Sequence, residues 1–108
     1  MPDYLFQLKY ESESTEGLIA NPHSREEIMR PVIEKLGGKI KGLWFSFGRY
    51  DVVVILTLPD NVSMKALSMA SNATGYIKDF KTTPLLSVDE SIQAMKKAST
   101  IEIKMPSK

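Results

Sequence analysis

The stretch SFGRYDVVVILTLP, residues 46–59, contains the longest apolar run of the chain, from Val52 to Leu56. Valine and isoleucine favour strands, and a strand that is apolar on both faces is typical of the middle of a sheet covered on both sides. The dipeptide at 48–49 precedes this strand and predicts a tight turn. We therefore expect a β-hairpin with strands at 39–47 and 50–58.

On both sides of the hairpin, the spacing of the apolar residues changes in turn between the two-residue period of a strand and the longer period of a helix. Apolar and polar side chains alternate over residues 4–10, which predicts a first strand, and a weaker pattern predicts a strand at 76–82. The polar stretch ESESTEG after the first strand is expected to be a loop. Pro31 lies inside the first expected helix, so we expect a kink there or a short turn followed by a restart. The expected helices begin at capping residues: Ser24, Asp60 or Asn61, and Ser87.

These elements give the order β-α-β-β-α-β followed by a C-terminal helix. This order predicts an α+β fold of the ferredoxin-like kind, in which four antiparallel strands form one sheet with helices on one face. The first and third strands occupy the middle of such a sheet. Because the helices cover only one face, the other face of the apolar third strand would be exposed in a monomer. A second copy of the chain is the expected cover, which predicts a two-fold homodimer or a higher oligomer.

The composition is that of one ordinary globular domain, because 43% of the 108 residues are hydrophobic and 25% are charged. We assign residues 1–98 to this domain and residues 99–108 to a C-terminal tail. In the tail, Ile101, Ile103 and Met105 alternate with charged residues. That alternation favours packing on the sheet edge or on a neighbouring subunit.

Charge and residue counts argue against several classes of partner. A formal net charge of +1 with scattered lysines lacks the basic patch of a nucleic-acid-binding protein. The chain has no cysteine and a single histidine, so we expect no disulfide, no metal site and no other cofactor. No segment has the length and apolarity of a membrane span or the pattern of a signal peptide, which favours a cytoplasmic protein without a membrane partner.

Several motifs, taken together and in order, carry a resemblance to a known family. Gly48, Tyr50 and Asp51 form a G-x-Y-D pattern, and further matching stretches extend over nearly the whole chain: MPDYLFQLKY, NPHSREE, LGGK, LPDNVS and KTTPLLSVDESIQAMKKA. The sequence resembles the GYD domain family, small bacterial and archaeal proteins named for this motif. The resemblance implies a ferredoxin-like fold of the dimeric α/β-barrel kind. It implies no activity and no catalytic residues.

Asp51, at the start of the central strand, has two interpretations. A short acidic side chain at a hairpin usually accepts hydrogen bonds from the turn or pairs with a nearby cation such as Arg49. Alternatively, Asp51 is a general base in a pocket, with a pKa raised by desolvation. Tyr50 is then a candidate donor to a developing oxyanion. Regular alternation, however, points the side chains of Tyr50 and Asp51 to opposite faces.

Three further residues are candidates for the same pocket. Trp44 is expected on one face with Ile40 and Gly42, and a lone tryptophan more often anchors a core or an interface than a ligand. His23 lies in a loop, where an isolated histidine is usually solvated. Arg25, in the first helical turn beside it, supplies a cation for an anion site.

The glycines at three positions are assigned to turns. Gly37 and Gly38 follow a helix and precede a strand, which is the reverse of a phosphate-binding loop, so we interpret them as a helix stop. Gly48 is expected to adopt a positive φ in the hairpin turn.

Two classes of function remain open. The first is a homo-oligomeric module that binds a small organic ligand or serves assembly. The second is a cofactor-free enzyme, similar to an isomerase or a monooxygenase, that acts on a small organic acid or aromatic compound through Asp51. A turn-bonded Asp51 would favour the first class, whereas a buried Asp51 that faces a closed cavity would favour the second.

Overall fold

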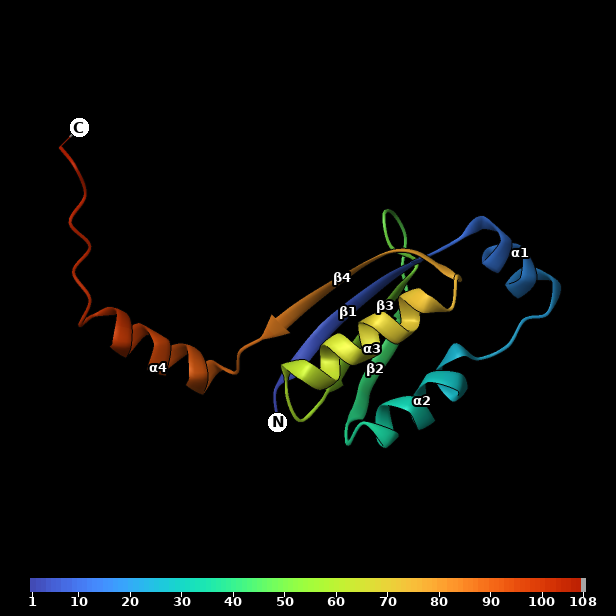
Figure 1. The fold of residues 1–108 in the computed structure, drawn as a ribbon, viewed down its shortest axis with the longest axis horizontal. Coiled ribbons are helices and arrows are strands. Elements are labelled where there is room, and N and C mark those ends of the chain that lie inside the picture. The colour runs from blue at the N-terminus through green and yellow to red at the C-terminus, as the bar shows by residue number, and fades with distance from the viewer. Residues whose placement is uncertain (108) are drawn as a thin grey trace.

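The fold is a ferredoxin-like α+β domain followed by a C-terminal helix, as expected, in a computed structural model that describes residues 1–107. In chain order the elements are β1 (Asp3–Tyr10), α1 (Ser12–Ala20), α2 (Arg25–Lys35), β2 (Lys39–Phe45), β3 (Val52–Thr57), α3 (Asn61–Ala73), β4 (Ile77–Leu85) and α4 (Val88–Ala98). The strands form one antiparallel sheet in the order β2-β3-β1-β4, so β1 and β3 lie in the middle. Helices α2 and α3 cover one face of this sheet (Figure 1).

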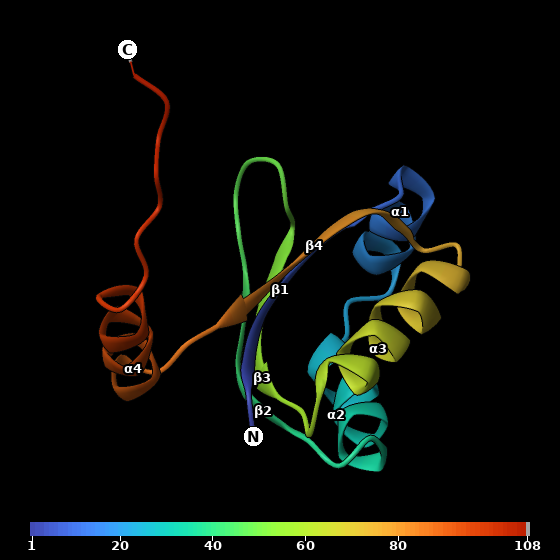
Figure 2. The same ribbon diagram turned by 60° about the vertical axis from the view of Figure 1, so that its left-hand side comes forward.

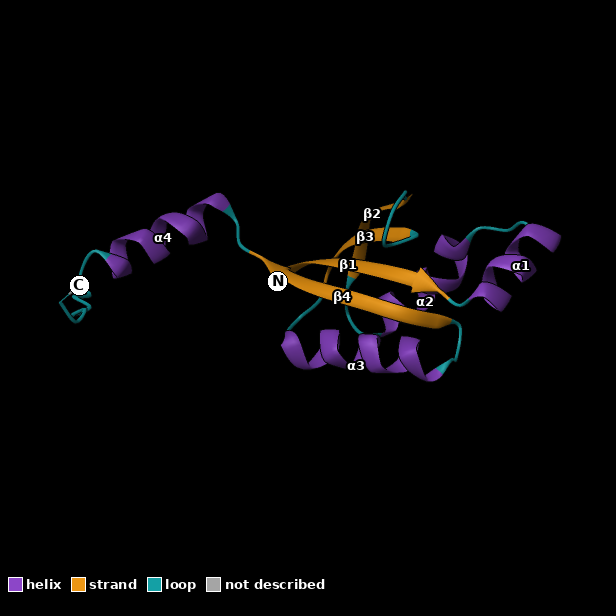
Figure 3. Ribbon diagram, turned by 90° about the horizontal axis from the view of Figure 1, so that it is seen from above, coloured by secondary structure: helices purple, strands orange, loops and turns teal. Residues whose placement is uncertain are grey.

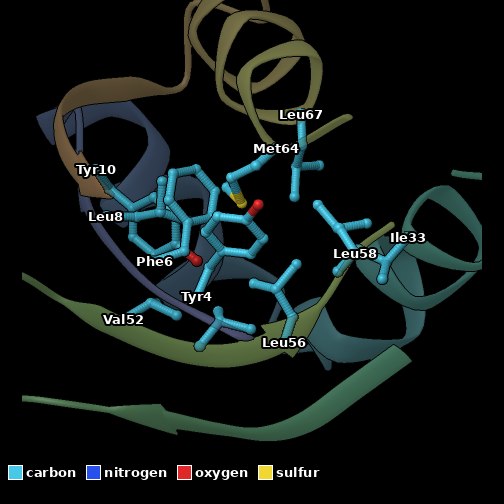
Figure 4. Close-up of a cluster of buried hydrophobic side chains, with 11 residues drawn as sticks. Tyr4, Phe6, Leu8, Tyr10, Ile33, Val52, Leu56, Leu58, Met64 and Leu67 are labelled. Carbon is cyan, nitrogen blue, oxygen red and sulfur yellow. The ribbon is translucent and has the colours of Figure 1, made fainter. Parts of the chain in front are cut away.

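The hydrophobic core lies between the sheet and helices α2 and α3, as Figure 4 shows. Every second residue of β1 is buried, and the register pairs Phe6 with Val54 and Leu8 with Val52 of β3. Inward side chains of the two central strands therefore lie side by side. The buried cluster comprises Tyr4, Phe6, Leu8, Tyr10, Ile33, Val52, Val54, Leu56, Leu58, Met64 and Leu67. Because each large apolar side chain contributes about 1.5–3 kcal/mol when buried, this layer dominates the stability of the fold.

The hairpin between β2 and β3 has shorter strands and a longer turn than expected. The N–H of Ser46 donates to the carbonyl oxygen of Asp51 at 2.8 Å, so this pair closes a turn of residues 47–50 in place of a two-residue turn. Gly48 has a φ of 89°, in the left-handed region that favours glycine. Phe47, at the tip, is fully exposed.

Strand β2 contains an irregularity that changes which side chains share a face. The register shifts between Ile40, which pairs with Leu56, and Gly42, which pairs with Ile55. The extra residue of this bulge places Ile40 on the core side, while Gly42 and Trp44 lie on the opposite face. The expectation that Ile40 shares a face with Trp44 is therefore wrong, because simple alternation does not take account of a bulge.

The face of the sheet opposite to α2 and α3 carries no packed helix in the described chain, and we call it the open face (Figure 3). The register places Leu5 and Gln7 of β1 beside Val53 and Ile55 of β3 on the central strands of this face, with Trp44 on the edge strand β2 and Thr83 and Leu85 on the edge strand β4. Trp44 is 55% exposed, and its indole ring lies back over Gly42. The polar margin of the face includes an ion pair between Lys41 and Asp3, with Nζ and Oδ2 2.9 Å apart.

Helix α1 forms where the sequence predicted a loop. Its polar residues show no apolar periodicity, so the pattern gave no sign of it. Two hydrogen bonds hold its beginning: the N–H of Glu11 and the hydroxyl of Ser14 both donate to the carbonyl oxygen of Tyr76, at 2.8 and 3.0 Å. A tertiary contact thus stabilises a helix that local sequence alone does not specify.

The remaining helices agree with the expected starts, with two differences. Helix α2 runs as one element through Pro31, so of the two alternatives expected there, a kink or a restart, the restart does not occur. Ser24 stands at the N-cap of α2 without a side-chain capping bond. The capping box at α4 does form, between Ser87 and Glu90. Asp60 caps α3 by accepting a hydrogen bond from the N–H of Ser63 at 2.8 Å.

The two glycines after α2 have different roles. Gly37 adopts a φ of 86° and ends the helix, together with a hydrogen bond of 3.0 Å from the N–H of Gly38 to the carbonyl oxygen of Ile33. Position 38 has no room for a side chain, because a Cβ there would lie 2.1 Å from the carbonyl oxygen of Thr57. Glycine at both positions lets the chain turn directly from α2 into the sheet.

The C-terminal segment stands away from the domain (Figure 2). Helix α4 has no buried residue, and residues 99–107 form neither helix nor strand. Figures 2 and 3 show α4 beyond the end of β4, on the side of the sheet away from α2 and α3. The tail residues Ile101, Ile103 and Met105 are 63%, 76% and 78% exposed, so in the single chain the tail does not pack on the sheet edge. Packing on a neighbouring subunit stays a prediction.

Candidate functional site

A largely apolar pocket of about 300 Å³ lies between the end of β1, the start of β4 and helices α2 and α3. Its size is at the lower end of the range for small-molecule sites. Most of the lining side chains are aliphatic, two carry hydroxyl groups (Ser71 and Thr74), and at one end a cation meets two phenol rings. The lining residues are Leu8, Tyr10, Arg25, Ile28, Met29, Val32, Leu67, Ala70, Ser71, Thr74, Tyr76 and Ile77.

Arg25 provides the positive charge of the pocket. Its guanidinium carbon lies 5.5 Å from the centre of the Tyr10 ring and 5.7 Å from the centre of the Tyr76 ring, within the range of cation–π attraction. The Nε atom of Arg25 is buried and has no hydrogen-bond partner among the described residues. A buried donor without an acceptor is costly, so the cation at this end of the pocket is incompletely hydrogen-bonded.

Each of these three side chains reaches the pocket from a different part of the chain. Tyr10 is the last residue of β1 and follows the inward alternation of that strand. Arg25 is the first residue of α2. Tyr76 follows Gly75, which has a φ of 78° and ends the α3 segment. The carbonyl oxygen of Tyr76 accepts the hydrogen bond from the N–H of Glu11, at the start of α1. The topology of the sheet therefore assembles a group of residues that are far apart in the sequence.

The electrostatic character of this end of the pocket is positive. Burial raises the pKa of the Tyr10 phenol; the nearby Arg25 charge opposes that rise, and Asp51 adds to it. Because the pKa lies above its ordinary value, Tyr10 is a neutral hydroxyl at physiological pH and can donate a hydrogen bond. A cation flanked by a neutral donor favours an anionic group.

Asp51 is bonded to the backbone of a neighbouring strand. Its Oδ2 atom accepts a hydrogen bond of 2.9 Å from the N–H of Tyr10, and its own N–H donates to the carbonyl oxygen of Leu8 at 2.8 Å. Lys9 Nζ lies 4.0 Å from the same carboxylate. Asp51, which directly precedes β3, thus links the hairpin to β1 by hydrogen bonds beyond the last residue pair of the two strands, Leu8 with Val52.

The other residues proposed from the sequence do not gather around Asp51. Tyr50 lies in the turn, where its carbonyl oxygen accepts from the hydroxyl of Ser46 at 2.6 Å and its ring lies 5.6 Å from the Arg49 guanidinium. Trp44 lies on the open face. His23 is exposed, with Nδ1 2.7 Å from the carbonyl oxygen of Asn21.

Of the five candidates from the sequence, Arg25 lines the pocket, and Asp51 lies behind it at the backbone of Tyr10. Sequence reasoning missed Tyr10 and Tyr76 as pocket residues. Tyr10 matched the apolar alternation of the strand, and Tyr76 was interpreted as a strand start. The signal that was present is chemical: a tyrosine on the inward face carries a hydroxyl, which needs a polar partner that a leucine would not need.

Two further features bear on the possible chemistry. Within residues 1–107, no three histidine, aspartate or glutamate side chains lie together in a way that would hold a metal ion. None of the described helices combines the length and the apolarity that crossing a membrane requires.

Comparison with known proteins supports the fold and gives the family. The crystal structure of FFRP-DM1 superposes with a TM-score of 0.50 at 14% sequence identity, over 80% of this chain and 100% of that chain. At this identity the similarity concerns the fold alone. No curated protein shows significant similarity to the sequence. The model of the GYD domain matches residues 4–95, which include β1 through most of α4, and the chain therefore belongs to the GYD domain family.

Proposed function

We propose that this GYD domain is a binding module for a small organic acid with an apolar body, which occupies the pocket between the sheet and helices α2 and α3. The observation that carries the proposal is the position of the Arg25 guanidinium, between two phenol rings, at one end of a pocket that is otherwise lined mainly by aliphatic side chains. A carboxylate at this point gains a charge-assisted hydrogen bond. The apolar body of the same ligand packs against the side chains of α2 and α3.

The composition of the pocket favours binding over catalysis. A cofactor-free enzyme of the isomerase or monooxygenase kind needs a general base near its substrate. Among the described residues that line the pocket, the ionisable ones are Arg25 and two tyrosines, with no carboxylate or histidine. Asp51, the base considered from the sequence, has its carboxylate engaged by the N–H of Tyr10.

We propose in addition that the module acts as a homodimer in which the open faces of two sheets meet. The support for this proposal is the apolar group Leu5, Val53 and Ile55 on the central strands, beside Gln7, with the exposed ring of Trp44 on the neighbouring edge strand. Clustered exposed apolar side chains of this kind often mark an interaction surface. Two ferredoxin-like sheets packed in this way form a barrel, and the pocket of each copy stays on its own helix side.

The experiment that tests ligand binding is a thermal-shift and calorimetric screen with small aromatic, keto and branched aliphatic acids, each beside its neutral amide. The variant Arg25→Met removes the charge but keeps much of the volume. Arg49→Met is the matched control, because Arg49 also lies over a tyrosine ring, 5.6 Å from Tyr50, but outside the pocket. We expect acids to raise the melting temperature of the parent and of Arg49→Met, and not of Arg25→Met. Equal shifts with acids and amides, or binding that persists in Arg25→Met, would overturn the proposal.

A further inference from the structure

The pocket between α2 and α3 is elongated, with its charged group at one end. The first residue of α2, Arg25, lies beside Tyr76, which follows α3, so the two helices run in opposite directions along the pocket (Figure 1). Along α2 the lining runs from Arg25 to Val32. Along α3 it runs from Thr74 back to Leu67. At a rise of about 1.5 Å per residue, each of these two rows is about 10 Å long.

The volume and the length of the pocket together indicate the shape of its ligand. A volume of about 300 Å³ holds about ten atoms other than hydrogen, if each takes about the 30 Å³ of a water molecule in the liquid. Spread over a pocket about 10 Å long, this number amounts to about one atom per ångström. Such a spacing is that of an extended chain, whereas a ring system with the same number of atoms is shorter and leaves one end of the pocket empty.

Beyond the charged end, the lining offers little to a second polar group of a ligand. The hydroxyl of Ser71 donates to the carbonyl oxygen of Leu67 at 2.8 Å, and that of Thr74 donates to the carbonyl oxygen of Ser71 at 2.7 Å, so both protons are engaged. On α2, the lining side chains Ile28 and Val32 are 52% and 44% exposed. An apolar chain that extends along α2 removes part of both side chains from water.

We infer that the ligand is a straight-chain monocarboxylic acid of about eight carbons, whose carboxylate lies at Arg25 and whose chain extends between α2 and α3 toward Leu67. This inference rests on the proposed function and adds the chemical class of the acid. Ala70 lies in the middle of the path, about one helical turn from both Leu67 and Thr74. Its side chain is the smallest of the lining and is exposed, so a larger one there closes the path without disturbing the core.

The test is isothermal titration calorimetry of the full chain with the straight-chain acids from butanoic to decanoic acid, each beside its primary amide. For the parent we expect the affinity to rise up to about four-fold with each methylene group as far as octanoic acid. It should then level off, because further methylene groups extend into water. Octanedioic acid, which places a second carboxylate at the apolar end, should bind at least about ten-fold more weakly than octanoic acid.

The variant Ala70→Leu tests the path of the chain. It leaves the charged end open, so we expect butanoic acid to bind as to the parent, but the affinity should stop rising at pentanoic or hexanoic acid. Ala66→Leu is the matched control, because it makes the same change at an exposed position of α3 outside the lining. It should keep the profile of the parent. Far-ultraviolet circular dichroism verifies that both variants have the parent's fold.

The possible failures separate this inference from the proposed function. Acids that bind with an affinity independent of chain length would overturn the straight-chain assignment and leave the binding of an organic acid in place. Octanedioic acid that binds as tightly as octanoic acid, or the same profile in the two leucine variants, would do the same. If none of the acids binds, or if acids and amides bind equally well, both the assignment and the proposed function are wrong.

Discussion

The carboxylate of Asp51 accepts a hydrogen bond from the backbone N–H of Tyr10, with 2.9 Å between Oδ2 and N. The bond joins the G-x-Y-D turn to the strand end that carries a pocket side chain. This hydrogen bond explains the presence of an acidic residue at the start of a central strand without any catalytic role. It completes the hydrogen bonding of β1 where β3 no longer runs beside it.

The first prediction tests this role of Asp51. Asp51→Ala should lower the free energy of unfolding by about 1–2 kcal/mol, because the Tyr10 N–H loses its charged acceptor. Asp51→Asn keeps an acceptor oxygen and should cost less. Chemical denaturation followed by circular dichroism measures both. An alanine variant as stable as the parent would contradict the structural role, and a stable asparagine variant that no longer binds ligand would point to a chemical role instead.

Much of the fold could be predicted from local patterns. Alternation in β1 and the apolar run in β3 indicate two central strands, and the glycines after α2 indicate its end. The bulge in β2 and helix α1 could not be predicted in the same way. The bulge depends on the pairing with β3, and α1 depends on hydrogen bonds to Tyr76, which is distant in the sequence.

The candidate site was less predictable than the fold for a related reason. Arg25 was identified because a cation at a helix start is visible in the sequence. Its neighbours Tyr10 and Tyr76 are brought to it by the sheet, and both are found where aromatic residues also occur for packing alone. Reasoning from motifs instead pointed to Tyr50 and Trp44, which the turn and the bulge direct elsewhere.

The second prediction concerns pH and the start of α3. Hydrogen bonding from Ser63 lowers the pKa of Asp60 below its ordinary value. The ionised cap therefore contributes stability that is present above about pH 4 and is lost as the pH falls through the lowered folded-state pKa. The variant Asp60→Asn places a comparable cap without a charge at the same position. We expect the parent's melting temperature to fall relative to that of Asp60→Asn below about pH 4, and a constant difference across this range would contradict the assignment.

The third prediction uses Trp44, the only tryptophan of the chain, as its own probe. A Cβ at position 42 would lie 2.2 Å from the indole ring, so Gly42→Ala should displace the ring from the open face. The expected result is a changed fluorescence maximum and near-ultraviolet circular dichroism. Gly17→Ala is the control, since a Cβ there meets no atom within 4 Å, and it should leave the Trp44 signal unaltered. An unchanged spectrum in Gly42→Ala would show that the ring does not rest on the glycine.

The last prediction tests whether the open face is an interface. Ile55 lies at its centre, paired with Leu5 on one side and with Gly42 on the other. In a monomer, Ile55→Lys can extend its ammonium group into water and should fold normally, whereas in a dimer it places a charge inside an apolar contact. We expect parent protein of dimer mass in sedimentation at micromolar concentration, and Ile55→Lys of monomer mass with unchanged far-ultraviolet circular dichroism. Met69→Lys makes the same kind of change at an exposed position of α3, in the helical layer, and should remain dimeric. A parent protein that sediments as a monomer would rule out the face-to-face dimer, and an Ile55→Lys variant that stays dimeric would place the interface elsewhere on the molecule.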